Sequence, residues 1–401
     1  MGTTKFNSTI LNVKLTTSFV NALRCALSPS KGFIPLHEPR VAELEEEYVS
    51  NCIKSTFVSS VGEYVDRFEQ EIAEYTGSKR AIAVVNGTAA LHISLLLSGV
   101  HKDDEVLIPG LTFVATANAV SYCGARPHFV DSEEDTLGVD PIKLDEYLSE
   151  ISHVSQDSCI NKNTGKKISA IIPVHIFGHP CKIEEIVEVA ARYNITVVED
   201  AAESLGSFYK DKHTGTFGKL GIISFNGNKI ITTGGGGAIL TDDDRLADQA
   251  KHITTTAKVP HRWDYVHDHI GFNYRMPNLN AAFGCAQLQN LEKFLVSKRQ
   301  LFARYEEVFQ KFDFASILKE PFNCRSNYWL QTMMLNHQDK SLKEELLSSL
   351  NDAGLMSRPA WTGIHKLKPF ESCPRMDMET LEDLELKIIN LPSSAFLSGK
   401  V

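Results

Sequence analysis

Residues 81–97 read AIAVVNGTAALHISLLL, a stretch that joins a strand-like run to a helical one. The run Ala81–Val85 is short and wholly apolar, as expected of a strand buried in a sheet. Asn86 and Gly87 then supply a turn, and a helical pattern follows as far as Leu97. This order of strand, turn and helix is the repeating unit of α/β proteins with a parallel sheet.

The same alternation continues along residues 57–244. Its strand-like runs are short and apolar, and helical patterns lie between many of them, which predicts a mostly parallel sheet with helices on both faces. After Ala81–Val85, the expected strands are Glu105–Ile108, Pro127–Val130, Ile168–Val174, Ile195–Val198, Gly221–Phe225 and Gly237–Leu240. Ligands bind such sheets at the carboxyl ends of the strands, so the residues that follow each run are the first candidates for a site.

Periodic signals weaken between Lys251 and Asn278, and a different organisation follows. We expect Asn278 to cap a long amphipathic helix that reaches Phe309, and Trp329–Leu335 to form a strand. The predicted parts are an N-terminal extension (residues 1–30), a large domain (residues 31–260) and a small α+β domain (residues 261–401).

The bulk composition excludes several classes of protein. The 401 residues carry a net charge of −9, which argues against binding to nucleic acid or anionic membranes through a general positive charge. The eight cysteines form no C-x-x-C pair, as expected of reduced thiols rather than a zinc or iron–sulfur site. Met1–Ser30 lacks the apolar core of a signal peptide or spanning helix, and Leu11–Leu27 predicts a short appended helix. We therefore expect a soluble cytoplasmic protein without a metal.

Two of the turns after strands carry groups suited to binding a ligand. At Asn86–Ala90, small residues let backbone N–H groups approach an anion at the positive end of a helix, although the same residues could form only a tight turn. Asp200 directly follows the run Thr196–Glu199. A carboxylate in that position could be catalytic, or it could be the N-cap of a helix.

Two further features lie at Lys229 and Thr232–Gly237. Lys229 closely follows a buried strand, where partial desolvation would make its amine nucleophilic, although lysines at such positions are often simply solvated. The four glycines of Gly234–Gly237 do not match the G-x-G-x-x-G spacing, and a strand rather than a helix follows them, so a dinucleotide loop is rejected. The glycines either let the backbone pass close to a bulky group or form a turn.

An anion cradle, a carboxylate and a lysine thus follow one another on successive strand ends. Pyridoxal 5′-phosphate (PLP) needs this set, because it has a phosphate to anchor, a pyridinium nitrogen to keep protonated and an aldehyde that bonds to an amine. The order of Asn86–Ala90, Asp200 and Lys229 therefore predicts a PLP enzyme.

These motifs resemble those of the DegT-like family of sugar aminotransferases, which have the fold-type I architecture of PLP enzymes. The resemblance covers about Ile34–Ser394 and implies a large domain with a mostly parallel seven-stranded sheet flanked by helices, plus a smaller C-terminal α+β domain. Its most specific pieces are Asn86–Leu91, Thr112–Thr116, Val198–Ser204, Ser224–Gly237 and Gly271–Met276.

The resemblance also implies the cofactor contacts. Lys229 becomes the Schiff-base lysine and the base and acid of the proton shift, and Asp200 pairs with the pyridine nitrogen. Phe113, at the start of an expected helix ending at Tyr122, stacks on the ring or is a core aromatic. Glu203 lies near the phenolic oxygen. The implied phosphate contacts are Gly87, Thr88, Ala89 and Ser224.

Asn273 resembles the family residue that reaches the cofactor phosphate of the neighbouring subunit. The resemblance therefore implies a homodimer with shared active sites, in which a monomer is inactive.

The implied substrates are L-glutamate and a nucleotide-linked keto-sugar. Ile34–Pro39 and Phe57–Gly62 resemble a narrower group that aminates C4 of UDP-linked 4-keto-6-deoxy-N-acetylhexosamines, on routes to legionaminic acid or bacillosamine in cell-surface polysaccharides. Ser60, Gly62 and Tyr64 fall where the family shapes its sugar pocket. His175 is a pocket residue or a satisfied core histidine, and Arg358 and Trp361 are substrate contacts or ordinary surface and core residues.

Other outcomes remain open within the same family. Relatives with histidine in place of Lys229 dehydrate sugars, so the lysine favours transamination, and a 3-aminotransferase is a further alternative. A non-catalytic regulatory homologue is disfavoured because Lys229 and Asp200 are both present. Many relatives have glutamate at the position of Gly235, which marks this chain as a member of a sub-branch.

Overall fold

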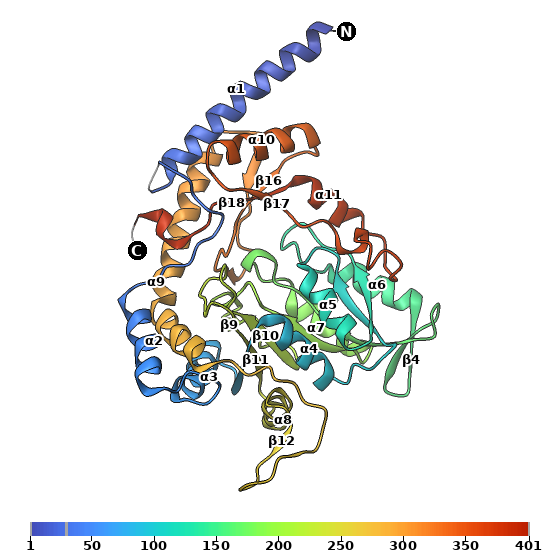
Figure 1. The fold of residues 1–401 in the computed structure, drawn as a ribbon. Coiled ribbons are helices and arrows are strands. Elements are labelled where there is room, and N and C mark those ends of the chain that lie inside the picture. The colour runs from blue at the N-terminus through green and yellow to red at the C-terminus, as the bar shows by residue number, and fades with distance from the viewer. Residues whose placement is uncertain (1, 29–30, 400–401) are drawn as a thin grey trace.

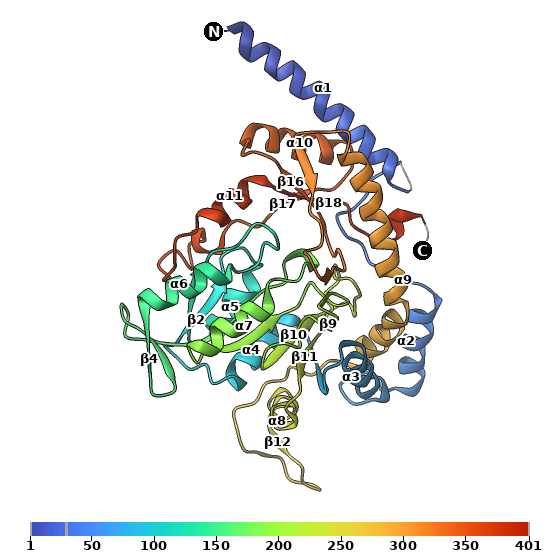
Figure 2. The same cartoon turned by 180° about the vertical axis from the view of Figure 1, so that it is seen from behind.

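The computed structural model describes residues 2–28 and 31–399, and side chains from residue 14 onward within those ranges. Figures 1 and 2 show a large sheet covered by helices, with a smaller set of strands and helices above it. The long helix α9 (Asn278–Phe309) runs from the lower part to the upper one (Figure 1). Within the described ranges, no helix is both long and apolar enough to cross a membrane.

The large sheet follows the order β1-β11-β10-β7-β6-β2-β3. Strands β10, β7, β6, β2 and β3 pair in parallel, whereas β11 is antiparallel to both of its neighbours. The hairpin of β4 (Ser152–Ser155) and β5 (Ser158–Asn161) pairs with the first residues of β6, Lys167 and Ile168. The strands of the main path are β1 (Arg80–Val84), β2 (Glu105–Pro109), β3 (Arg126–Val130), β6 (Lys167–Ile171), β7 (Thr196–Asp200), β10 (Leu220–Ser224) and β11 (Gly237–Thr241).

This architecture confirms the predicted fold class, including a mostly parallel path of seven strands. The reversal at β11 has a local cause. Residues 225–236, between β10 and β11, form no helix, and a parallel connection needs a longer crossover. The chain therefore turns back, and Phe225 and Gly236 bond across the start of the connection. Lys229 lies in this turn.

Helices cover both faces of the sheet. Helix α4 (Gly87–Leu97) is buried on nearly every side, in keeping with its mostly apolar sequence. Asn86 is its N-cap, since the side-chain oxygen accepts the Ala89 N–H at 2.8 Å. The other helices of this part are α3 (Glu63–Thr76), α5 (Val114–Tyr122), α6 (Pro141–Ile151), α7 (Ile183–Arg192) and α8 (Asp244–Thr254).

The upper part is built on a four-stranded antiparallel sheet of order β14-β16-β18-β17. Its core joins the C-terminal half of α9 to residues of β16 and α10. The elements are β14 (Ala315–Ile317), β16 (Gln331–Leu335), β17 (Arg358–Pro359), β18 (Ile388–Leu391), α10 (Lys340–Asp352) and α11 (Glu379–Lys387). The short remaining strands are β8 (Phe208–Tyr209), β9 (Lys212–His213), β12 (Lys258–Val259), β13 (Val266–His267) and β15 (Cys324–Arg325).

The prediction that Asn278 caps α9 is wrong. Pro277 occupies the N-cap position, and Asn278 is the first helical residue. Its side chain instead accepts the Tyr64 N–H at 3.1 Å and donates to the Phe57 carbonyl at 2.7 Å. Asn278 therefore fixes the chain that enters α3, a tertiary role that the local sequence pattern does not reveal.

The N-terminal helix α1 (Gly2–Ala26) is longer than the expected Leu11–Leu27 and projects beyond the body of the molecule (Figures 1 and 2). Phe19 anchors it through edge-to-face contacts with Phe309, Phe312 and Phe314, at ring-centroid distances of 5.1–5.3 Å. Helix α2 (Glu43–Ser55) packs on α9. The predicted domain limits at residues 30 and 260 remain predictions.

Phe68 provides a test of how α3 is held in place. Its fully buried ring makes an edge contact with Phe225 at 4.9 Å. Phe68→Ala is expected to lower the free energy of unfolding by about 3–5 kcal/mol through lost burial and the cavity left behind. Urea denaturation measures this, with Phe322→Ala as the control because Phe322 is 90% exposed. Equal losses in the two variants would contradict the packing described.

Candidate active site

A cavity of 320 Å³ lies at the carboxyl ends of the parallel strands. Residues that follow β1, β2, β6, β7 and β10 line it from the large sheet, and two tryptophans line it from the chain beyond residue 320. The lining residues are Asn86, Gly87, Thr88, Leu91, Thr112, Phe113, Ala115, Thr116, Val174, Asp200, Ala202, Glu203, Ile222, Ser224, Asn226, Asn228, Lys229, Trp329 and Trp361. The structure thus brings together Lys229, Asp200, Glu203, Ser224, Gly87, Thr88, Phe113 and Trp361 of the predicted set.

Asp200 is the last residue of β7 and is 5% exposed. One carboxylate oxygen accepts the Thr116 hydroxyl at 2.9 Å, and the other accepts the Ala202 N–H at 3.1 Å. Burial raises the pKa of Asp200, while these hydrogen bonds and the charge of Lys229 oppose the rise. The carboxylate is therefore held in one orientation at the wall of the cavity.

Glu203 lies one turn further along the chain and contacts the lysine. Its Oε1 is 3.4 Å from Lys229 Nζ, and its Oε2 accepts the N–H of Phe177 at 2.8 Å. Burial is the largest influence on Glu203 and raises its pKa to about 6, although Lys229 opposes this. Phe177 adopts a left-handed backbone (φ 54°), which aims its N–H at the carboxylate.

The N-terminus of α4 also lines the cavity, with Gly87 and Thr88 in its first turn. A Cβ at Gly87 would lie 3.0 Å from the Ser224 Cβ, so glycine allows the two strand ends to meet closely. Unpaired N–H groups and the helix dipole favour an anion here. The Ala89 N–H already donates to the Asn86 side chain. In this arrangement it is therefore not available for the phosphate contact predicted for Ala89.

Aromatic side chains also line the cavity. Phe113 is the N-cap residue of α5, so the helix begins one residue later than predicted, and its ring is 54% exposed. The Trp361 ring lies 6.4 Å from Phe113 and 5.0 Å from Phe177, measured between centroids. Phe113 is therefore placed as an accessible face rather than as a core aromatic.

His175 does not line the cavity. It is fully buried, and its Nε2 lies 3.1 Å from Glu199, while its Nδ1 accepts the Cys181 N–H at 3.2 Å. Glu199 also accepts the N–H groups of Gly215, Phe217 and Gly218. Of the two alternatives for His175, the geometry favours the satisfied core histidine.

Several other predicted residues lie away from this cavity. Gly62 and Tyr64 are fixed against Asn278 at the start of α9, and Tyr64 is buried beside Tyr48. Ser60 is half-buried in the loop before them. Arg358 is exposed on β17. Their roles in binding sugar remain predictions.

Asn273 is also outside the cavity of its own chain. It is exposed, and its Oδ1 accepts the Arg275 guanidinium at 3.3–3.4 Å. An exposed position is compatible with the predicted reach into a second subunit, which remains a prediction.

Comparison with known proteins identifies the family. Residues 39–400 match the model of the DegT/DnrJ/EryC1/StrS aminotransferase family. The chain belongs to this family. A GDP-perosamine synthase of Escherichia coli O157:H7 is 38% identical over 92% of this chain and 95% of its own, and one from Caulobacter vibrioides is 35% identical over 91% and 94%. Among solved structures, a DegT DnrJ EryC1 StrS aminotransferase from Brucella abortus superposes with a TM-score of 0.79 at 27% identity, covering 88% of this chain and 91% of the other.

The chain is accordingly a PLP-dependent sugar aminotransferase of fold-type I. The two perosamine synthases are named for a GDP-linked sugar, not for the UDP-linked N-acetylhexosamine that the sequence resemblance implies. The family and reaction class are thus confirmed, whereas the narrower substrate group is not.

The residues of the cavity suit the cofactor of a DegT aminotransferase. Asp200 can pair with a protonated ring nitrogen, and Lys229 can bond to the aldehyde carbon. The α4 N-terminus and Ser224 can hold the phosphate, and Phe113 can cover a ring face. The oriented carboxylate and the close approach at Gly87 are the structural features that support this fit.

Among the cavity residues that sequence reasoning missed, two make side-chain contacts with Asp200 or Lys229. Thr116 lies within the motif Thr112–Thr116, and its hydroxyl orients Asp200, yet a threonine in an expected helix gives no sign of this contact. Trp329 was expected only as the start of a strand, but its ring faces Lys229. Both contacts join residues more than 80 positions apart in the chain.

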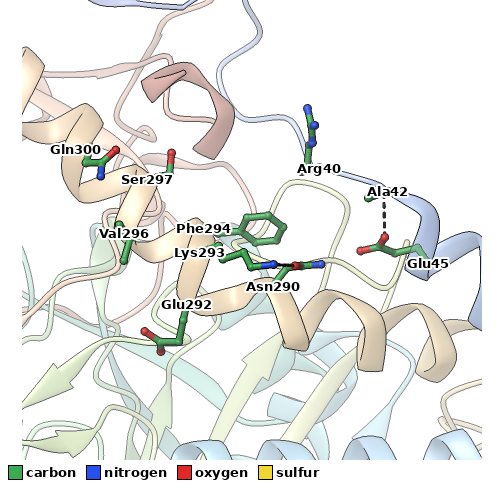
Figure 3. Close-up of a pocket in the computed structure, with 10 residues that line it drawn as sticks. All are labelled: Arg40, Ala42, Glu45, Asn290, Glu292, Lys293, Phe294, Val296, Ser297 and Gln300. Atoms are coloured by element: carbon green, nitrogen blue, oxygen red, sulfur yellow. Dashed lines mark hydrogen bonds between the residues drawn. The ribbon is translucent and has the colours of Figure 1, made fainter. Parts of the chain in front are cut away.

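A second cavity, of 530 Å³, lies between the segment before α2 and one face of α9 (Figure 3). Phe294 and Val296 contribute apolar surface, and Arg40, Glu292 and Lys293 lie around it. None of the residues predicted to carry chemistry lines this cavity.

The raised pKa of Glu203 predicts a pH-dependent stability in the cofactor-free protein. The neutral form is favoured on folding, so the stabilisation is present below about pH 4.5 and is lost as the pH rises through about 6. Glu203→Gln should therefore be more stable than the natural protein by roughly 2 kcal/mol at pH 8, and by much less at pH 4.5. Urea denaturation at the two pH values measures the difference. A difference independent of pH would contradict the assignment.

Proposed function

We propose that this DegT aminotransferase transfers the amino group of L-glutamate to C4 of a UDP-linked 4-keto-6-deoxy-N-acetylhexosamine. The products are 2-oxoglutarate and a UDP-4-amino-4,6-dideoxy sugar. The observation that carries the reaction type is the placement of Lys229 Nζ, 3.4 Å from Glu203, in one cavity with the buried carboxylate of Asp200. The resemblance of Ile34–Pro39 and Phe57–Gly62 supports the sugar class.

The bound cofactor supplies an electron sink that stabilises negative charge at the reacting carbon. Asp200 keeps a positive charge on the ring nitrogen, and its two hydrogen bonds hold it in place for this. Lys229 Nζ takes the α-proton of glutamate and later delivers a proton to C4 of the sugar. Glu203 lies beside the amine, 3.4 Å from Nζ, where it can hold the side chain of Lys229 in place between these steps.

The lysine also bears on the direction of the chemistry. An amine can both bond to the cofactor and move a proton, as two-stage amino transfer requires. The dehydratase alternative depends on histidine at this position, and this chain has Lys229. The 3-aminotransferase alternative differs only in which sugar carbon meets Nζ.

A GDP-linked 4-keto-6-deoxyhexose is the second candidate substrate. It is favoured by the two GDP-perosamine synthases, which match more than nine-tenths of this chain. The purified enzyme should be given each sugar nucleotide with glutamate, and the product analysed by mass spectrometry and NMR. Higher kcat/KM with the UDP sugar and an amine at C4 support the proposal. Preference for the GDP sugar, an amine at C3 or loss of water would each reject it.

Lys229→Ala tests the assignment of the amine. The purified natural protein is expected to absorb near ~420 nm, as PLP bonded to a lysine does. Lys229→Ala should lose this band and amino transfer, because no other side chain of the cavity supplies an amine. Absorbance spectra and 2-oxoglutarate formation measure the two effects. Lys293→Ala is the control, since Lys293 lines the other cavity. A Lys229→Ala protein that keeps its band would refute the role.

Shared active sites can be tested with hybrid dimers. We propose that Asn273 of one subunit completes the phosphate site of the other. Lys229→Ala and Asn273→Ala subunits, each inactive alone, should regain activity when mixed under conditions that exchange subunits. One site of the hybrid then carries both defects, and the other carries neither. The expected recovery is up to half of the activity per hybrid dimer, and no recovery would contradict sharing.

A further inference from the structure

Lys229 has a second contact besides Glu203. Its Nζ lies 4.0 Å from the centroid of the Trp329 ring, within the range of a cation–π interaction. The lysine side chain is 13% exposed and that of Glu203 is 5% exposed. The ammonium therefore lies between a carboxylate and an aromatic face, where little water competes for it.

Trp329 is fixed on several sides. Its indole Nε1 donates to the Asn228 carbonyl at 2.6 Å, and its backbone N–H donates to Asn327 Oδ1 at 2.7 Å. The residue is 4% exposed. Because Asn228 immediately precedes Lys229, the indole is bonded to the same turn that carries the lysine. The same turn of the chain therefore holds both the Trp329 ring and the Lys229 side chain.

The side chain of Lys298 bonds to the backbone of Trp329. Its Nζ donates to the Trp329 carbonyl at 3.1 Å and also to the Ser393 carbonyl. Lys298 is fully buried, and burial lowers its pKa well below the usual range. A buried amine is destabilising unless it is hydrogen-bonded. The bonds to the Trp329 and Ser393 carbonyls therefore hold the Lys298 side chain and the Trp329 backbone together.

We propose that Trp329 is a positioning residue that holds the Lys229 ammonium against Glu203 whenever Nζ is not bonded to the cofactor. The inference rests on the proposed role of Lys229. A lysine has four rotatable carbon bonds, and amino transfer needs its Nζ to return to the same atoms in each half-reaction. The indole face confines the amine to the cavity, and it does so without forming a covalent bond.

The interaction can be measured in the cofactor-free protein by a double-mutant cycle. Trp329→Leu, Lys229→Met and the double variant are compared by their urea midpoints. Trp329→Leu should lower the midpoint clearly less in the Lys229→Met background, because the cation is already absent there. Trp361→Leu is the matched control, since Trp361 lines the same cavity and packs on Phe177, and its effect should be additive with Lys229→Met.

Half-reaction kinetics give the functional readout. In Trp329→Leu, single turnovers with glutamate and with the keto-sugar should both slow about tenfold, while KM for the sugar changes less than twofold. Trp329→Phe, which retains an aromatic face, should recover most of the rate. Trp329→Met, which is large and apolar but has no aromatic face, replaces Trp329→Leu in the cycle if the leucine variant fails to fold.

Additive urea midpoints would overturn the proposal, as would a change confined to KM. These outcomes are distinct from failure of the proposed function. If the ~420 nm band persists in Lys229→Ala, the lysine is not the bonding amine. The midpoint cycle uses no cofactor, so it still reports whether Trp329 holds the ammonium.

Discussion

Two adjacent carboxylates are buried at the end of β7, and separate segments of the chain supply their hydrogen-bond donors. Glu199 is fully buried and Asp200 is 5% exposed, so each needs several hydrogen-bond donors. Successive side chains of a strand point to opposite faces, and the two residues accordingly have separate partners. Glu199 takes His175 and the backbone of residues 215–218, which fixes the chain entering β10. Asp200 takes Thr116 and faces the cavity.

This division explains why one carboxylate is structural and its neighbour is available for chemistry. The three backbone hydrogen bonds to Glu199 stabilise the connection from β7 to β10, and β10 leads directly into the turn that carries Lys229. Asp200 is held at both oxygens but remains at the cavity wall. The carboxylate that fixes the backbone, Glu199, and the carboxylate at the cavity wall, Asp200, are therefore neighbouring residues of one strand.

The sequence alone was sufficient for the seven strands of the main path, because each is a continuous buried run whose apolar character is local information. It was not sufficient for the hairpin of β4 and β5, and β4 is mostly exposed. It was also sufficient to bring Asp200, Glu203 and Lys229 into one cavity, because their positions follow from the strand ends and from the family motifs. It was not sufficient for Asn278 or Trp329. Asparagine is a common helix-cap residue, but the side chain of Asn278 bonds instead to Phe57 and to Tyr64 in the first turn of α3. Trp329 is placed by contacts with Asn228 and Lys298, which no local pattern contains.

In the glycine run after Lys229, the structure requires glycine at one position but has room for a side chain at another. A Cβ at Gly237 would lie 2.6 Å from the Asn86 carbonyl carbon and 2.8 Å from the Gly87 nitrogen, so glycine is required for β11 to pass the α4 N-terminus. The bulky group that the run approaches is therefore the backbone of the anion cradle itself. At Gly235, by contrast, a Cβ would meet only the Val85 carbonyl oxygen, at 3.9 Å. The glutamate that the family resemblance associates with this position is thus not excluded by packing. Its absence removes a negative charge from the turn between Lys229 and β11, which is a difference in the electrostatics of the site rather than in its fold.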